Sequence, residues 1–176
     1  IIYVNKMDRT GANFFNVVDE MEKKLKANPV PLFLPVGSEN DFKGIIDLIN
    51  FKYLTFDQND YGQTIIEEKI PEEFIDLSNE WREHLIDKAS NFDEEIMDLF
   101  FNEEEIPNDK LKLAIRKGCL KRELLPVFVG SSLKNIGVQP VLDGVVDYLP
   151  SPLDITATFG INVKKNTEVQ ILHDEN

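Results

Sequence analysis

The sequence predicts an α/β fold in which a smaller α+β subdomain is inserted into a parallel sheet. Apolar runs at 1–4, 32–36 and 124–129 have the continuous, branched character of strands buried on both faces. Amphipathic helices are expected after the first and last of these runs, and this alternation builds parallel sheets. The chain between them, 39–123, has mixed polarity and carries most of the acidic residues, so it is expected to be an insert.

The composition limits the class of protein. With 176 residues, of which 42% are hydrophobic, the chain can form one domain, or one domain with an inserted subdomain. Its single cysteine, Cys119, excludes an intramolecular disulfide and a multi-cysteine zinc site. No apolar run approaches the roughly 20 residues of a membrane-spanning helix, so no membrane partner is expected. The chain begins inside a strand-like run without an initiator methionine, and we expect a piece of a longer protein.

The first part of the core, 1–38, is expected to hold two strands around one helix. The opening apolar run gives way to polar residues at Asn5, where a loop begins. Apolar side chains then recur at helical spacing from Asn13 until Pro29 stops the helix. The second strand follows at 32–36.

The insert is expected to hold a hairpin followed by three helices. Two stretches of mixed polarity, 44–57 and 64–69, predict the strands of the hairpin around a turn-rich segment. Proline and two glutamates at 71–73 predict a helix start, because acidic residues favour the first turn. Two shorter helices are predicted from Asp93 and from Pro107.

The second part of the core, 124–150, has strand, loop and helix in the same order. A Gly-Ser-Ser turn follows the strand, and the helix is expected near 140–148. Residues 151–176 are expected to form a linker toward a further domain, with one possible strand at 168–172. Both parts of the core therefore place a polar loop directly after a buried strand.

Acidic residues are concentrated in the insert. Positions 57–109 hold 18 Asp and Glu against 3 Lys and Arg, in a chain of net charge -13. Such a block repels nucleic-acid phosphates, so direct DNA binding is not expected. It attracts basic protein surfaces, although a merely solvated face has the same composition. The composition leaves both interpretations open.

The loop after the first strand carries the pattern Asn5-Lys6-Met7-Asp8. Ligands of α/β folds bind at the carboxyl ends of parallel strands, which is where this loop is expected. A carboxylate at Asp8 can accept both the ring N–H and the exocyclic amino group of a guanine, a donor pair that adenine lacks. Asn5 is expected to bridge the base and the neighbouring loop, and the Lys6 stem to lie along the base or sugar. The alternative is an ordinary polar loop at a strand end.

A second loop, 130–135, follows the last core strand and precedes a helix. Small residues there let backbone N–H groups approach a ligand closely. In a guanine site the amides of Ser131, Ser132 and Leu133 would donate to the exocyclic oxygen of the base. The alternative is a structural turn without a ligand.

Together the two loops resemble a known family. Residues 5–14, Asn-Lys-Met-Asp-Arg-Thr-Gly-Ala-Asn-Phe, and residues 130–139 resemble the base-contacting segments of elongation factor G, the ribosomal translocation GTPase. Segments 44–48 and 79–82 resemble the subdomain inserted in that factor, and 148–152 resembles the exit to its second domain. The resemblance implies the C-terminal half of a P-loop GTPase-type parallel sheet, with GTP or GDP as ligand and the ribosome as partner.

The phosphate-binding motif GxxxxGK[ST] does not occur in the sequence, since none of its 9 glycines is followed by lysine. The resemblance implies that the intact protein hydrolyses GTP with Mg²⁺, using a phosphate loop and switch regions that precede the first base loop in the family. We therefore expect no catalytic and no metal-ligating residue in this chain, and no GTP hydrolysis by it alone.

The resemblance also implies partners and a location. The inserted subdomain of the family faces the ribosomal stalk proteins, and the candidates here are Glu80, Glu83 and Asp87, whose spacing places them on one helical face. Two alternatives are a ribosome-recycling GTPase, which shares most of these motifs, and a non-catalytic module with an acidic binding surface. Segments 111–116 and 126–129 look more like the mitochondrial factor, so an organellar location is expected rather than a bacterial cytoplasm or secretion.

Overall fold

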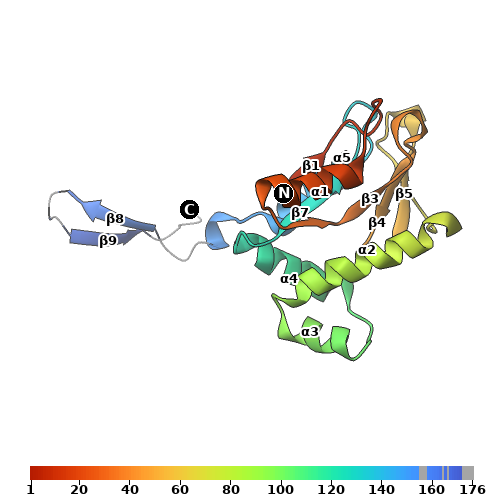
Figure 1. The fold of residues 1–176 in the computed structure, drawn as a ribbon. Coiled ribbons are helices and arrows are strands. Elements are labelled where there is room, and N and C mark those ends of the chain that lie inside the picture. Colours follow the sequence, from red (N-terminus) through yellow and green to blue (C-terminus); the bar gives the residue numbers. More distant parts are fainter. Residues whose placement is uncertain (155–157, 164, 166, 172–176) are drawn as a thin grey trace.

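The structure, a computed structural model, describes residues 1–154, 158–163, 165 and 167–171 (Figure 1). Three sheets are present in this part of the chain: a parallel sheet of three strands, an antiparallel sheet of four strands and a two-stranded hairpin. Five α-helices accompany them in the described residues. The mixed α/β class predicted from the sequence is confirmed.

The parallel sheet joins the two ends of the core. Its strand order is β1 (Ile2–Val4), β7 (Leu125–Val129) and β2 (Pro29–Pro31), with β7 in the middle. Ile2 pairs with Val127 on one side, and Pro29 pairs with Leu125 on the other. The central strand is therefore supplied by a segment that lies beyond the whole insert in the sequence.

The strand expected at 32–36 begins earlier and is divided between two sheets. β2 belongs to the parallel sheet, whereas β3 (Phe33–Val36) pairs with the insert. The antiparallel sheet has the order β3-β4-β5-β6, with the further strands β4 (Gly44–Asp47), β5 (Lys52–Phe56) and β6 (Ile65–Glu68). The single strand expected at 44–57 is thus two strands around a turn, and the predicted hairpin is β5 and β6.

The core helices begin and end near their predicted residues. In α1 (Phe14–Leu25) the Asn13 side chain caps the first turn, accepting from the Asn16 amide at 3.0 Å. In α5 (Val138–Tyr148) Gly144 faces the Phe128 ring of β7. The absence of a Cβ at this position lets the helix lie directly on the central strand.

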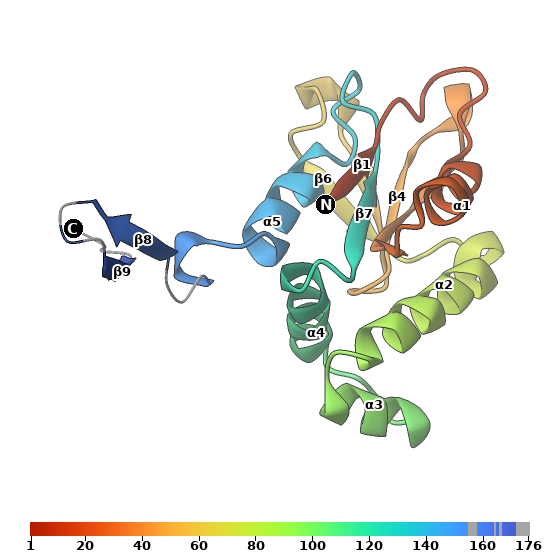
Figure 2. The same ribbon diagram turned by 60° about the vertical axis from the view of Figure 1, so that its left-hand side comes forward.

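Three helices complete the insert: α2 (Glu72–Ser90), α3 (Glu94–Phe101) and α4 (Asn108–Leu120). The apolar stripe of α2 ends in Leu85 and Ala89, both buried. Arg82 fastens α2 to the antiparallel sheet, because its guanidinium donates to the carbonyls of Leu48 and Ile49. α4 packs on β7 and α5, so the insert and the core share contacts (Figure 2).

Beyond the core, η3 (Pro152–Asp154) leads to a hairpin of β8 (Thr158–Asn162) and β9 (Thr167–Ile171). The strand expected at 168–172 is β9, except for Leu172, which lies outside the described residues. β8 was not expected from the sequence. None of the helices in the described part of the chain has the length and apolarity needed to cross a membrane.

Gly144→Ala is expected to lower the free energy of unfolding by about 1–3 kcal/mol. A Cβ at this position would lie 2.1 Å from Phe128 Cζ, and the neighbouring Phe33 and Tyr148 rings restrict the movement of the Phe128 ring. Urea unfolding measures the change, with the exposed neighbour Asp143→Ala as control. Equal stability of the two variants would contradict this account of the contact between α5 and β7.

Candidate functional site

Two loops meet at the carboxyl ends of β1 and β7, and they form the candidate site. We call residues 5–13 the first loop and residues 130–137 the second loop. Val4 pairs with Val129 at the ends of the two strands, and the Gly130 amide donates to the Val4 carbonyl at 3.0 Å. The Met7 amide in turn donates to the Gly130 carbonyl at 3.2 Å. The parallel register therefore brings the two predicted motifs side by side.

The central contact of the site joins Asp8 to Ser131. The Ser131 hydroxyl donates to Asp8 Oδ1 at 2.6 Å, and Ser131 is fully buried. This hydrogen bond holds the pKa of the Asp8 carboxyl below its usual range, and the charges of Arg9 and Lys134 act in the same direction. The side chain of Asp8 is 7% exposed, and Arg9 Nε lies 3.8 Å from its second oxygen. Asp8 is thus an ionised, oriented acceptor in a sheltered position.

Asn5 makes the second connection between the loops. Its Nδ2 donates to Ser132 Oγ at 2.9 Å, and its Oδ1 accepts from the Ser132 amide at 3.0 Å and from the Lys6 amide at 2.7 Å. The predicted bridge from Asn5 to the neighbouring loop is present. The Ser132 amide is therefore already paired, and it is not free to donate to a base in this structure.

The other two predicted residues, Lys6 and Leu133, lie on the rim. Both are exposed, and Leu133 retains 74% of its surface. Lys6 has a left-handed backbone, with φ of 66°, and its carbonyl accepts from the Arg9 amide at 3.0 Å. The chain turns tightly here, and this turn carries Asp8 back toward the second loop.

Sequence reasoning missed two residues that support the site. Tyr3, on β1, donates its hydroxyl to the Ile136 carbonyl of the second loop at 3.2 Å. Burial and the Asp8 carboxylate raise the pKa of Tyr3 to about 12, so it stays a neutral donor. Glu39 accepts from the Gly11 amide at 2.7 Å. No local pattern marks Glu39, because its partner lies 28 positions away in the sequence.

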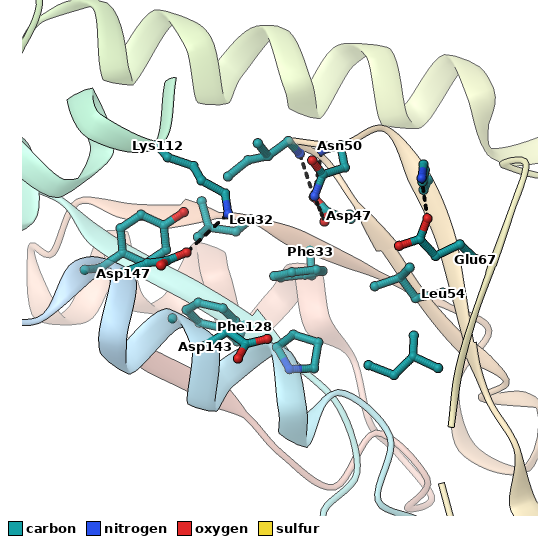
Figure 3. A pocket seen from close by; sticks show the side chains of 16 residues that line it. Leu32, Phe33, Asp47, Asn50, Leu54, Glu67, Lys112, Phe128, Asp143 and Asp147 are labelled. Atoms are coloured by element: carbon teal, nitrogen blue, oxygen red, sulfur yellow. Dashed lines mark hydrogen bonds and ion pairs between the residues drawn. The ribbon is translucent and has the colours of Figure 1, made fainter. Parts of the chain in front are cut away.

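Two hollows are of interest as nucleotide sites. One of about 280 Å³ borders the first loop, between Asn5 and Val17. The other, of about 250 Å³, lies between the antiparallel sheet, α4 and α5 (Figure 3).

The second hollow does not suit a nucleotide. Two of its carboxylates, Glu67 and Asp147, are paired with Lys52 and Lys112. Two further carboxylates, Asp47 and Asp143, line it as well. Its net negative charge would repel phosphate groups, so the loops remain the candidate site. Within the described residues no group of three or more His, Cys, Asp and Glu side chains is placed to hold a metal ion.

Comparison with solved structures supports the fold. A crystal structure of a protein from Thermus thermophilus superposes with a TM-score of 0.73 and 23% sequence identity. The match covers 88% of this chain and 22% of the Thermus chain. At this identity the likeness establishes the fold alone, and the present chain spans about a fifth of that protein.

One family of sequences matches the chain over the whole core and insert. The family described as "Elongation factor Tu GTP binding domain" matches residues 1–151. That span contains both loops, the parallel sheet and the antiparallel sheet. The chain therefore belongs to the elongation factor Tu GTP-binding domain family of translational GTPases.

Proposed function

We propose that this chain is the guanine-recognising part of an elongation factor G, with the subdomain inserted in that factor. Guanine-nucleotide binding follows from the family, and the assignment to this factor rests on the motifs in the two loops. The observation that carries the proposal is the 2.6 Å hydrogen bond from Ser131 to Asp8, which joins the two loops around one ionised carboxylate.

The chemistry of this carboxylate favours guanine. Two oxygens offer about four lone-pair positions, and Ser131 occupies one of them. The remaining positions can accept the ring N–H and the exocyclic amino group of guanine as a bidentate pair. Adenine presents no such pair, so its binding would leave a sheltered carboxylate unsatisfied, which is costly. The backbone amide of Leu133, an exposed residue, is our candidate donor to the exocyclic oxygen. The Lys6 stem is our candidate for the contact with the sugar face.

In the intact protein, hydrolysis of GTP would drive the movement of tRNA and mRNA through the ribosome. The phosphate loop, the switch regions and the Mg²⁺ ligands would lie outside these 176 residues, since the sequence has no GxxxxGK[ST] motif. We propose that the chain by itself binds the base without hydrolysing GTP. A mitochondrial location is proposed from segments 111–116 and 126–129, and a ribosome-recycling GTPase is the alternative member of the family.

The second proposed role is a contact with a basic ribosomal stalk protein. Glu80, Glu83 and Asp87 are exposed on α2, and no ion pair among the described residues engages them. Beside them a groove of about 340 Å³ runs between α2 and α3, with Ile86 and Phe100 in its lining. Three further glutamates, at 103–105, line the same groove. An apolar groove with acidic walls suits a basic, partly apolar partner surface.

Asp8→Asn is expected to weaken GDP binding to this chain by at least about tenfold, because the carboxylate loses one acceptor at unchanged size. Calorimetric titration with GDP measures the effect, ADP serves as the ligand control, and Asp76→Asn on the exposed surface of α2 serves as the protein control. Equal binding of GDP and ADP, or equal affinities of the two variants, would argue against base recognition by Asp8.

Ser131→Ala is expected to raise the pKa of Asp8 toward its ordinary value. In the folded wild type this pKa is depressed, so the ionised group stabilises the fold above about pH 4 and that contribution is lost as the pH falls further. Acidification from pH 7 to pH 3 should therefore lower the free energy of unfolding of the wild type more than that of Ser131→Ala. Urea unfolding at both values, with a carbon-13 NMR titration of the Asp8 carboxyl, makes the comparison. Identical titration curves would refute the assigned cause.

Charge reversal at Glu80 and Glu83 to lysine is expected to weaken capture of stalk protein at low salt and to reduce its salt sensitivity. The matched control reverses Glu123 and Asp143, which are exposed outside the acidic face of α2 and change the net charge equally. A pull-down over a salt series reports the difference. An equal loss of stalk-protein capture in both double variants would show that the net charge matters and that the positions of Glu80 and Glu83 do not.

A further inference from the structure

The antiparallel sheet of the insert directs two of its turns toward the base loops. Val36 of β3 pairs with Gly44 of β4, and Gly44 pairs with Thr55 of β5. The connection between β3 and β4, at 37–43, and the connection between β5 and β6, at 57–64, therefore lie at the same end of the sheet. Figure 1 shows this end beside the two loops. Each turn makes hydrogen bonds with a different loop.

The first turn holds the first loop at two points. The Glu39 amide donates to the Met7 carbonyl at 2.8 Å, and Glu39 Oε1 accepts from the Gly11 amide at 2.7 Å. These two points bracket Asp8 in the sequence. Glu39 adopts a left-handed backbone with φ of 56°, which is uncommon for this residue type. The constraint on Glu39 and its double contact together fix the segment that carries the carboxylate.

The second turn holds the second loop in a similar way. Asn135 Nδ2 donates to the Tyr61 carbonyl at 2.9 Å. Gln139, in the first turn of α5 directly after the second loop, donates through its Nε2 to the Gly62 carbonyl at 2.7 Å. A Cβ at Gly62 would lie 2.8 Å from the Asn135 carbonyl oxygen, so glycine is required for this approach. The Oε1 of Gln139 is buried and has no hydrogen-bond partner among the described residues. The amide of Gln139 is thus oriented entirely by its donor side.

We propose that Glu39 and Gln139 are positioning residues for guanine recognition, and that the antiparallel sheet holds both base loops in mutual register through them. This inference rests on the proposed guanine site. The two loops touch one another through short side chains, Asn5, Asp8 and the two serines. Such contacts form only if the backbones of the two loops stay within a fraction of an ångström of these positions. The two turns hold them there. The site is therefore preorganised for a base, and a less rigid insert would lower the affinity for guanine nucleotide.

The test compares three substitutions with one control in the full 176-residue chain. Glu39→Ala removes the acceptor for Gly11, Glu39→Gln restores it, and Gln139→Met removes the donor to Gly62 at similar size. The control is Asn28→Ala, which removes a 3.0 Å hydrogen bond from Asn28 to the Glu123 carbonyl near the start of β7. This bond is of the same kind and lies at the other end of the strand. Urea unfolding records the stability of each variant.

Amide hydrogen exchange of Gly11 and Ser132, the pKa of Asp8 by carbon-13 NMR, and the dissociation constant for GDP are the readouts. Glu39→Ala and Gln139→Met should accelerate exchange and weaken GDP binding by about fivefold or more, and they should raise the pKa of Asp8. Asn28→Ala and Glu39→Gln should match the wild type. The positioning role is overturned if amide exchange and the pKa of Asp8 are the same in Glu39→Ala and Gln139→Met as in Asn28→Ala. If the wild type fails to bind GDP, the proposed function fails, while exchange and pKa still decide this inference.

Discussion

The rest of the structure depends on the insertion of β7 between β1 and β2. Ile2 and Val127 are paired although the whole insert separates them in the sequence, so closing this sheet carries a loop-closure cost. Burial of the central strand offsets that cost, since Val127 to Val129 are almost inaccessible to solvent. The same pairing places two polar loops at one edge of the sheet. The candidate site is therefore a direct result of the core topology.

Leu32 forms hydrogen bonds with both the core and the insert. The Leu32 amide donates to the Val127 carbonyl of β7 at 2.9 Å, and its carbonyl accepts from the Leu48 amide at 3.0 Å. The parallel sheet and the antiparallel sheet thus share one extended segment. Within the insert, Arg82 connects α2 to the antiparallel sheet, because its half-buried guanidinium donates to two carbonyls of the turn between β4 and β5. Desolvation lowers the pKa of Arg82, and the Asp47 carboxylate partly compensates for it.

Charged side chains are distributed differently in the core and in the insert. The proposed base site has one carboxylate that a hydroxyl orients, and the charges of two basic side chains act on it, which favours an anionic nucleotide. The exposed carboxylates of α2 and the glutamates of the neighbouring groove belong to the insert. The proposed nucleobase site and the proposed protein-binding surface therefore lie in different parts of one chain. The two turns of the antiparallel sheet give the insert a physical connection to the nucleotide site.

The sequence by itself determined the α/β class, most of the helix limits and the residues that meet in the site. Local chemistry marks the helix starts at Asn13, Asp93 and Pro107. The donors and acceptors of the site can also be identified from the sequence alone, at Asn5, Asp8, Ser131 and Ser132. Only the tertiary structure decided how 29–36 divides between two sheets, because a run of buried apolar residues fits either partner equally. It also decided the pairing of the Ser132 amide and the hydrogen bonds of Glu39 and Gln139. Those depend on contacts between residues distant in sequence, and no local periodicity or spacing records such contacts.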